Sequence, residues 1–476
     1  MTGYSDQYDF PSEDPYVPAP SVPPPLAPRI PTDQESNRLP NFLQDANLAQ
    51  PTPDKIYYFK SPRLADLARQ SHVNKDRAIL LNSLLNSLGL LNSLHVEESR
   101  PATVEELSQY HSDTQYLTAL ANYQLFSPRQ LAQYGLVDDC APYPGMFEHA
   151  CLCVGGSIQA AAALAERRCK IAINFDGGRH HAIKAKASGF CYVNDVVLAI
   201  LRLLSTFKRV SYLDIDVHHG DAVEEAFKST ERVLTTSIHH SSPGYFPGTG
   251  GKLNSTNRTS NNGSSINNNG KSNISGKAEG FALNLPLEEG LKDGLFLQAF
   301  SELCNGIAEL YRPECIVMCC GVDGLANDPI GRAWSLTPAA YGAATAQVAS
   351  YGVPILLLGG GGYDSAAACC AFAAALAGIT GQALPEDVPQ HHYLDRYGPS
   401  YSLINPGRPS LAPDMNNDSE VEGMCESLLS VLRSALEKKH AVEQQKLGGN
   451  GENLGGGDGG LQRVVQAKRM KLEAHR

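Results

Sequence analysis

The sequence predicts an α/β fold in which a mostly parallel sheet is covered by helices on both faces. Its strand-like runs are short and almost continuously apolar, and helix-like stretches of three or more turns separate several of them. Continuous apolar strands are typical of parallel sheets that are buried on both sides, and the alternation is typical of crossover connections. Polar residues and glycines also gather directly behind four of the runs, where open α/β sheets bind their ligands.

Each element follows from its own pattern in chain order. The predicted strands are 169–175 (CKIAINF), 210–216 (VSYLDID), 233–238 (VLTTSI), 315–320 (CIVMCC) and 353–358 (VPILLL). The predicted helices are 192–207, 293–311 and 338–350. Together they make one sheet of crossover units rather than two separate domains.

Composition divides the 476 residues into one globular domain and polar flanks. Residues 1–53 contain 12 prolines and are predicted to form a disordered tail. A single domain is expected over 54–440, interrupted by an Asn/Ser-rich flexible loop at 251–280. The glycine-rich residues 441–476 are expected to form a flexible C-terminal tail.

Charge and cysteine content exclude several classes of function. A formal net charge of -11 disfavours binding to nucleic acid and favours basic partners. The 12 cysteines form no C-x-x-C motif, which predicts reduced thiols in an intracellular core. No signal-peptide pattern and no apolar run of about 20 residues are present, so we expect a soluble, unsecreted protein without membrane association.

The polar residues behind the four strands form one candidate site, because the carboxyl ends of parallel strands meet at one edge. On an extended strand Asp214, Asp216 and His218 share a face. Asp216, His218 and Asp323 would make a three-ligand site with an open position, as in catalytic zinc centres, and Zn²⁺, Fe²⁺ or Co²⁺ suits such ligands. The alternative is a buried salt-bridge network or a set of helix caps.

Five further side chains suit hydrolysis of an amide. His180 and His181 are candidates for proton transfer, and Asp214 and Asp221 are candidate partners that would keep them basic. Tyr363 follows four glycines and can donate a hydrogen bond to a developing oxyanion. The residues thus predict metal-assisted hydrolysis without naming the substrate.

Five motifs in order resemble the zinc-dependent histone deacetylases, class I in particular. They are NFDGGRHHAIKAKASGFCYVND, YLDIDVHHGDAVEEAF, SPGYFPGTG, GVDGLANDP and LGGGGY, and the resemblance extends over about residues 55–410. It implies a three-layer α/β/α sandwich around an eight-stranded sheet of the arginase/deacetylase type. It also implies hydrolysis of the acetyl amide of N6-acetyl-lysine on proteins, as in regulators of chromatin and transcription.

The resemblance assigns a role to each matched position. Asp216, His218 and Asp323 resemble zinc ligands; His181 with Asp221 resembles the general base and acid, His180 with Asp214 the second histidine pair, and Tyr363 the carbonyl-polarising tyrosine. Further matches concern the substrate tunnel (Gly189, Phe190, Phe246), the rim acid (Asp139), a structural K⁺ site (Asp214, Asp216, His218, Ser237) and an inner channel for acetate (Arg77).

Two departures from the family pattern bear on function. Arg179 stands where relatives usually have tryptophan, beside Arg77, so either the inner channel binds acetate more tightly or Arg179 turns to solvent. We therefore expect altered acetate release. Pro329 and Ala366 stand where members of corepressor complexes carry basic residues that hold an inositol phosphate, which predicts an independent, monomeric enzyme.

Other functions remain open on the sequence alone. The same fold could deacetylate non-histone proteins, such as a cohesin subunit, or small acetylated amines such as polyamines. A binuclear manganese arginase would want more bridging ligands. A catalytically silent module that binds acetyl-lysine or scaffolds chromatin belongs to a different class. We expect acetylated basic tails as partners, in the nucleus, the cytoplasm or both.

Overall fold

The computed structural model describes residues 56–251, 279–326, 328–406 and 412–449. Within them lies one eight-stranded sheet with the order β2-β1-β3-β8-β7-β4-β5-β6, and every neighbouring pair is parallel. The strands are β1 (Ile56–Lys60), β2 (His95–Glu98), β3 (Ile171–Asn174), β4 (Val210–Asp214), β5 (Val233–His240), β6 (Ala282–Leu287), β7 (Cys315–Cys319) and β8 (Ile355–Leu358). The predicted fold class is confirmed.

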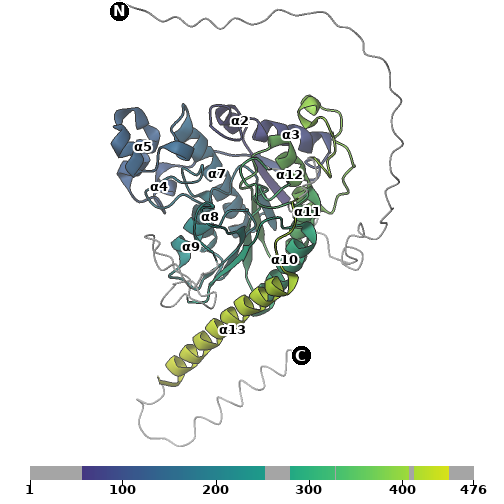
Figure 1. The fold of residues 1–476 in the computed structure, drawn as a ribbon. Coiled ribbons are helices and arrows are strands. Elements are labelled where there is room, and N and C mark those ends of the chain that lie inside the picture. Colours follow the sequence, from purple (N-terminus) through teal and green to yellow (C-terminus); the bar gives the residue numbers. More distant parts are fainter. Residues whose placement is uncertain (1–55, 252–278, 327, 407–411, 450–476) are drawn as a thin grey trace, which may run out of the picture. The chain divides into compact units, whose positions relative to one another are not determined.

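Helices cover both faces of this sheet. Those with described bounds are α2 (Pro62–Ala68), α3 (Arg77–Ser87), α4 (Val104–Leu107), α5 (Thr114–Ala121), α6 (Pro128–Gln133), α7 (Met146–Ala165), α8 (Asp195–Leu203), α9 (Asp221–Phe227), α10 (Asp293–Leu310), α11 (Pro338–Ser350), α12 (Ser365–Thr380) and α13 (Asp418–Gly449). Short 3-10 helices span residues 123–125, 138–140 and 394–397. Helices α3 and α10 to α12 pack into one apolar core, and α5, α7 and α8 into a second core on the other face (Figure 1).

The register of the central strands positions the site. Asp214, the last residue of β4, pairs with Cys319 at the end of β7 and with Ser237 in β5. Leu358 of β8 pairs with Cys319 and with Asn174 of β3. The segments that follow β3, β4, β7 and β8 therefore leave the sheet at one edge, as their sequence predicts.

Three strands escaped sequence prediction. The edge strands β2 and β6 and the neighbouring β1 are short or carry polar and proline residues, so their apolar patterns are weaker than those of the central strands. The predicted strands and helices are all present, with ends shifted by a few residues.

The predicted boundary at residue 440 falls inside a helix. Helix α13 continues to Gly449, so 441–449 is helical and not a flexible tail. The N-terminal tail, nearly all of the 251–280 loop and the rest of the C-terminal tail lie outside the described residues. Among the described helices, none has both the length and the apolar character needed to cross a membrane.

All 12 cysteines are buried and none is in a disulfide. Burial raises the pKa of every one of these thiols. They pack as small apolar side chains in the two cores.

Candidate metal centre and active site

Asp216, His218 and Asp323 form a buried cluster at the carboxyl edge of the sheet. Their ligand atoms lie within 4.8 Å of one another. Nδ1 of His218 lies 2.9 Å from Oδ2 of Asp323 and 3.1 Å from Oδ1 of Asp216. The three predicted ligands thus meet, although one of them is more than 100 residues from the others along the chain.

The route that brings them together differs from the predicted one. Strand β4 ends at Asp214, so Asp216 and His218 lie in a loop and not on an extended strand. The Asp216 amide donates to Oδ1 of Asp214 at 3.1 Å, and the His218 amide donates to Oδ1 of Asp216 at 3.0 Å. Two such side-chain-to-backbone bonds turn the chain at every second residue. The intervening Ile215 and Val217 remain in the core, as alternation predicts.

The electrostatics of the cluster favour a cation. Burial and the charge of Asp216 raise the pKa of Asp323 to about 7. Burial alone would lower the pKa of His218, but Asp323 and Asp216 raise it to about 10. Two buried carboxylates facing one imidazole attract a positive charge, which either the proton of the imidazole or a bound cation can supply. A divalent cation fits this donor set, whose oxygen and nitrogen atoms suit Zn²⁺ and similar ions.

Two histidine–aspartate pairs lie next to this cluster. Nδ1 of His180 donates to Oδ2 of Asp214 at 2.7 Å, and Nδ1 of His181 donates to Oδ1 of Asp221 at 2.9 Å. Each imidazole therefore keeps Nε2 for other partners. Nε2 of His180 lies 3.8 Å from Oδ1 of Asp216.

The two histidines have opposite pKa shifts. Burial lowers the pKa of His181 to about 4, and the neighbouring His180 adds to this effect. Burial also opposes charge on His180, but Asp214 and Asp216 outweigh it and raise the pKa to about 9. At neutral pH the arrangement pairs a charged His180 with a neutral His181, whose ring centroids lie 3.9 Å apart.

The loop that carries Tyr363 is fixed from both sides. Nη1 of Arg77 donates to the carbonyls of the preceding glycines 360, 361 and 362 at 2.9, 3.2 and 3.1 Å. Oδ2 of Asp328 accepts the Tyr363 amide at 2.7 Å. A Cβ at Gly361 would lie 2.1 Å from Oδ2 of Asp323, so the loop approaches the cluster as closely as only glycine permits.

Aromatic rings surround the approach to the cluster. The Phe246 ring lies 4.8 Å from that of His181, and Phe190 lies 5.5 Å from Tyr363, measured between centroids. Gly189 has a φ of +55° and Phe190 one of +62°. Oδ2 of the exposed Asp139 accepts the Gly189 amide at 2.9 Å, which ties the rim to this wall.

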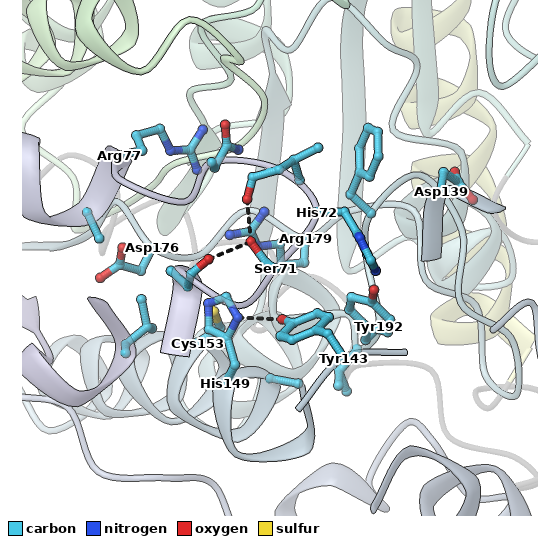
Figure 2. A pocket seen from close by; sticks show the side chains of 18 residues that line it. Ser71, His72, Arg77, Asp139, Tyr143, His149, Cys153, Asp176, Arg179 and Tyr192 are labelled. Atoms are coloured by element: carbon cyan, nitrogen blue, oxygen red, sulfur yellow. Dashed lines mark hydrogen bonds between the residues drawn. The ribbon is translucent and has the colours of Figure 1, made fainter. Parts of the chain in front are cut away.

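The structure also places the two arginines and the residues predicted to form a potassium site. Arg77 and Arg179 line one cavity beside the site (Figure 2), and Arg179 is partly exposed to solvent. Ser237 lies beside Asp214 in the sheet, and its hydroxyl is within 2.9 Å of Nδ1 of His239. His219, the residue after His218, is buried and contacts Thr249, Glu224 and Asn284.

Sequence reasoning missed several residues at the site. Asp328 supports the tyrosine loop, Cys319 lies within ligand distance of His180 and Asp214, and the pair Tyr143 and His149 lines the cavity with Arg179. Asp328 was detectable, because it is a second acid in the GVDGLANDP motif. The others follow from packing between distant segments and leave no local pattern.

Comparison with known proteins decides the family. The model of the histone deacetylase domain matches residues 71–379, well over half of the chain. The chain belongs to the histone deacetylase family. This confirms the predicted resemblance, the fold and the enzyme class, an amide hydrolase.

The relatives in this family share about a third of their residues with the chain. Histone deacetylase 8 of Danio rerio is 34% identical over 394 residues, which cover 82% of this chain and 99% of the relative. Histone deacetylase B of Dictyostelium discoideum is 36% identical over 361 residues, which cover 75% of this chain and 81% of the relative. Histone deacetylase RPD3 of Saccharomyces cerevisiae is 33% identical over 356 residues, which cover 73% of this chain and 77% of the relative. The similarity therefore spans most of each protein.

Proposed function

We propose that this histone deacetylase family member hydrolyses the acetyl amide of N6-acetyl-lysine on proteins. One observation carries the proposal: a buried three-ligand cluster lies beside two histidine–aspartate pairs at one edge of the sheet. Hydrolysis of an amide needs an activated water, a polarised carbonyl and a proton for the leaving amine. The residues at this edge can supply all three.

Asp216, His218 and Asp323 would hold the metal ion, Zn²⁺ by preference, with Fe²⁺ or Co²⁺ as alternatives. When bound, such an ion polarises the amide carbonyl and lowers the pKa of the attacking water. The backbone around Asp214, Asp216, His218 and Ser237 is the proposed site of a structural K⁺.

His181 is the proposed general base and acid. Asp221 accepts its Nδ1 proton, which leaves Nε2 free to take a proton from water and return it to the lysine amine. His180 is oriented in the same way by Asp214 and stabilises negative charge beside it. Tyr363 would donate its hydroxyl proton in a hydrogen bond to the carbonyl oxygen as charge develops.

The aromatic walls suit a lysine side chain. Phe190 and Phe246 would pack along its methylenes at Gly189, and Asp139 at the rim would bind the substrate backbone. Arg77 and Arg179 would line an inner channel for the acetate product. We propose acetylated basic tails as substrates, histones first, with non-histone proteins or small acetylated amines as the alternative.

A silent acetyl-lysine-binding module is the second candidate, because Arg179 departs from the family pattern. The decisive experiment incubates zinc-loaded protein with an acetyl-lysine peptide and measures acetate. We expect acetate from the wild type and, following removal of one oxyanion donor, about 10²-fold less from Tyr363→Phe. Peptide binding without acetate from either protein would establish the binding module instead.

We further propose a monomer that needs no inositol phosphate and acts in the nucleus, the cytoplasm or both. Pro329 and Ala366 support this, since neither side chain can bind a phosphate. Light scattering should give the mass of one chain, and inositol hexakisphosphate should leave turnover unchanged. Activity that requires the phosphate would contradict the proposal.

A further inference from the structure

The loop 241–250, which carries the aromatic ring of Phe246, has little packing of its own. Gly244 and Gly248 lie on either side of Phe246, each with a φ of +81°, and no described atom lies within 4 Å of the position of a Cβ on either glycine. The Phe246 side chain is 39% exposed, and its ring lies 4.8 Å from that of His181 between centroids. The position of this ring beside the candidate site therefore depends on the residues that anchor the loop.

Two side-chain contacts anchor the loop close to Phe246. Before it, the Tyr245 hydroxyl donates to the Gly331 carbonyl at 2.7 Å. After it, the Thr249 hydroxyl lies 2.8 Å from Nδ1 of His219. His219 neither holds the metal nor transfers a proton in the proposed reaction, so its contact with Thr249 serves a different purpose.

The ring of His219 is fixed from its other side. Its side chain is buried, and Nε2 lies 3.0 Å from Oδ1 of Asn284 in β6 and 3.2 Å from Oε2 of Glu224 in α9. Nδ2 of Asn284 donates to the same Glu224 oxygen at 2.6 Å, so the three side chains form a closed triangle. Because both neighbours of Nε2 are acceptors, Nε2 donates to them. The ring cannot turn without losing these bonds, and Nδ1 stays directed at Thr249.

A second histidine, His239, supports the same end of the loop. Its ring lies 4.5 Å from that of His219 between centroids. Nε2 of His239 donates to the Gly250 carbonyl at 3.1 Å, and Nδ1 accepts from the Ser237 hydroxyl at 2.9 Å. A Cβ at Gly250 would lie 2.4 Å from Nε2 of His239 and 2.8 Å from Cγ of His219. The backbone of residue 250 therefore rests directly on the two rings.

Helix α9 connects this anchor with the proposed proton-transfer pair. Its first residue, Asp221, binds His181, and Glu224, three residues further on, binds His219. Side chains three residues apart lie on the same face of a helix. One short helix thus orients both the proposed general base and the support of the loop that carries Phe246.

We propose that His219 is a positioning residue that fixes Phe246 through Thr249 and so limits the size of the acyl group that the site accepts. A ring whose loop is anchored on both sides encloses the acyl group closely, whereas a loop released at one end lets the ring move outwards. In a close-fitting pocket one methylene group changes kcat/KM by about 10–200-fold. The inference rests on the proposed deacetylase function for the substrate, but not for the anchoring contact.

The first experiment measures backbone amide exchange over 242–250 in the full-length protein by mass spectrometry. Thr249→Val removes the hydroxyl and keeps the branched shape, so exchange should be about fivefold faster than in the wild type. Thr249→Ser keeps the hydroxyl and should exchange as the wild type does. Ser83→Ala is the matched control, because it removes a hydroxyl that lies 2.9 Å from Nδ1 of His391, and it should leave this segment unchanged. Equal exchange in Thr249→Val and the wild type overturns the proposal.

The variant His219→Phe tests the histidine itself. It keeps a ring and removes both nitrogen atoms, so exchange over 242–250 should again be faster. Thr249→Val should then add nothing in this background, because the two residues act through one contact. A full additional effect of Thr249→Val would overturn the role of His219. Should His219→Phe fail to fold, the comparison of Thr249→Val with Thr249→Ser still decides whether the hydroxyl anchors the loop.

The second experiment compares kcat/KM for peptides that carry acetyl-lysine and butyryl-lysine. The ratio of butyryl to acetyl should rise about tenfold in Thr249→Val and stay unchanged in Thr249→Ser and Ser83→Ala. An equal fall for both substrates would mean that the contact supports only the fold, and would overturn the role in specificity. Amide exchange does not depend on turnover. A wild type that shows the expected exchange but cleaves neither peptide would refute the proposed function, and with it the limit on acyl size, while the anchor stands.

Discussion

Gly189 lies where two side chains of the candidate site approach the backbone. Its φ of +55° is strained for any other residue, and an added Cβ would lie 2.6 Å from Cδ2 of His181 and 2.9 Å from the Phe246 ring. Gly244, in the loop before Phe246, has a φ of +81° but no atom within 4 Å of its Cβ position. Substitution of either glycine would strain the backbone, but only substitution of Gly189 would also disturb side chains of the site. Comparing the two variants therefore distinguishes the two effects.

Gly189→Ala should lower kcat/KM about tenfold or more, because the methyl group displaces His181 or Phe246. Gly244→Ala should lower the free energy of unfolding by about 1 kcal/mol, as the strain at Gly189→Ala also should. It should leave turnover nearly unchanged. Peptide deacetylation and urea unfolding of both variants measure the difference. Equal loss of activity would mean that strain alone is responsible.

Asp328 shows how one carboxylate can fix a loop. Oδ1 accepts the amides of Ile330 and Gly331 at 3.0 and 2.7 Å, while Oδ2 accepts that of Tyr363. An asparagine cannot accept at both positions, because its nitrogen would face an N–H group.

Asp328→Asn should therefore destabilise the fold by about 1–3 kcal/mol and lower kcat more than it raises KM, since Tyr363 loses its anchor. Asp364→Asn is the matched control, because only Oδ1 of Asp364 accepts amides, as the N-cap of α12, a position that asparagine fills equally well. Thermal unfolding and steady-state kinetics test both. Similar behaviour of the two variants would contradict the anchoring role.

At the scale of elements, His111 joins two segments that are distant in sequence. Nδ1 lies 3.1 Å from the Lys184 carbonyl, and Nε2 lies 3.0 Å from the amide of Asn194, the N-cap of α8. Because Nε2 accepts from an amide, it carries no proton, and the ring must be neutral. Burial lowers its pKa from 6.5 to about 4.

This link predicts how stability depends on pH. The unfolded chain takes up the His111 proton near pH 6.5 and the folded chain near 4, so stability is full above 6.5 and falls as pH drops towards 4. The loss is on the order of 3 kcal/mol. Urea unfolding from pH 7 to 4 should show a smaller slope for His111→Gln than for the wild type. The exposed His392→Gln is the control, and an unchanged slope in His111→Gln would refute the link.

At the scale of the whole molecule, the candidate metal cluster joins segments that follow three strands of one sheet. Asp216 and His218 follow β4, Asp323 follows β7, and the Gly361 amide after β8 donates to Oδ2 of Asp216 at 2.7 Å. A cation bound there would connect three strand ends, so its removal should lower the stability of the entire domain.

Chelation should therefore lower the melting temperature of the purified protein, and added Zn²⁺ should restore it. Binding at a thousandfold excess over Kd corresponds to about 4 kcal/mol. The melting temperature of Asp323→Asn should change little with either chelator or added Zn²⁺, because the substitution weakens metal binding. It leaves no cavity in the core. If the melting temperature of the wild type changes with neither chelator nor zinc, the protein does not bind an ion tightly at this site.

The sequence reveals much of this architecture because the central strands are apolar throughout and end in polar residues. Asp216, His218 and Asp323 were found because parallel strands align their ends. The bend after Asp214 was missed, since it depends on which amide each carboxylate accepts. His149 was missed because a histidine within an apolar helix gives no local signal, and its place beside Tyr143 and Arg179 depends on tertiary packing.

The buried thiols have a practical consequence for spectroscopy. Thiolates, not thiols, react with maleimides, and a raised pKa leaves each native cysteine almost entirely protonated at pH 7. A cysteine introduced at an exposed position, such as Leu125, which is 80% exposed, would then be the reactive one. The native chain can thus carry a single fluorophore or spin label without removal of any of its own cysteines, and distances to the active site become measurable in solution.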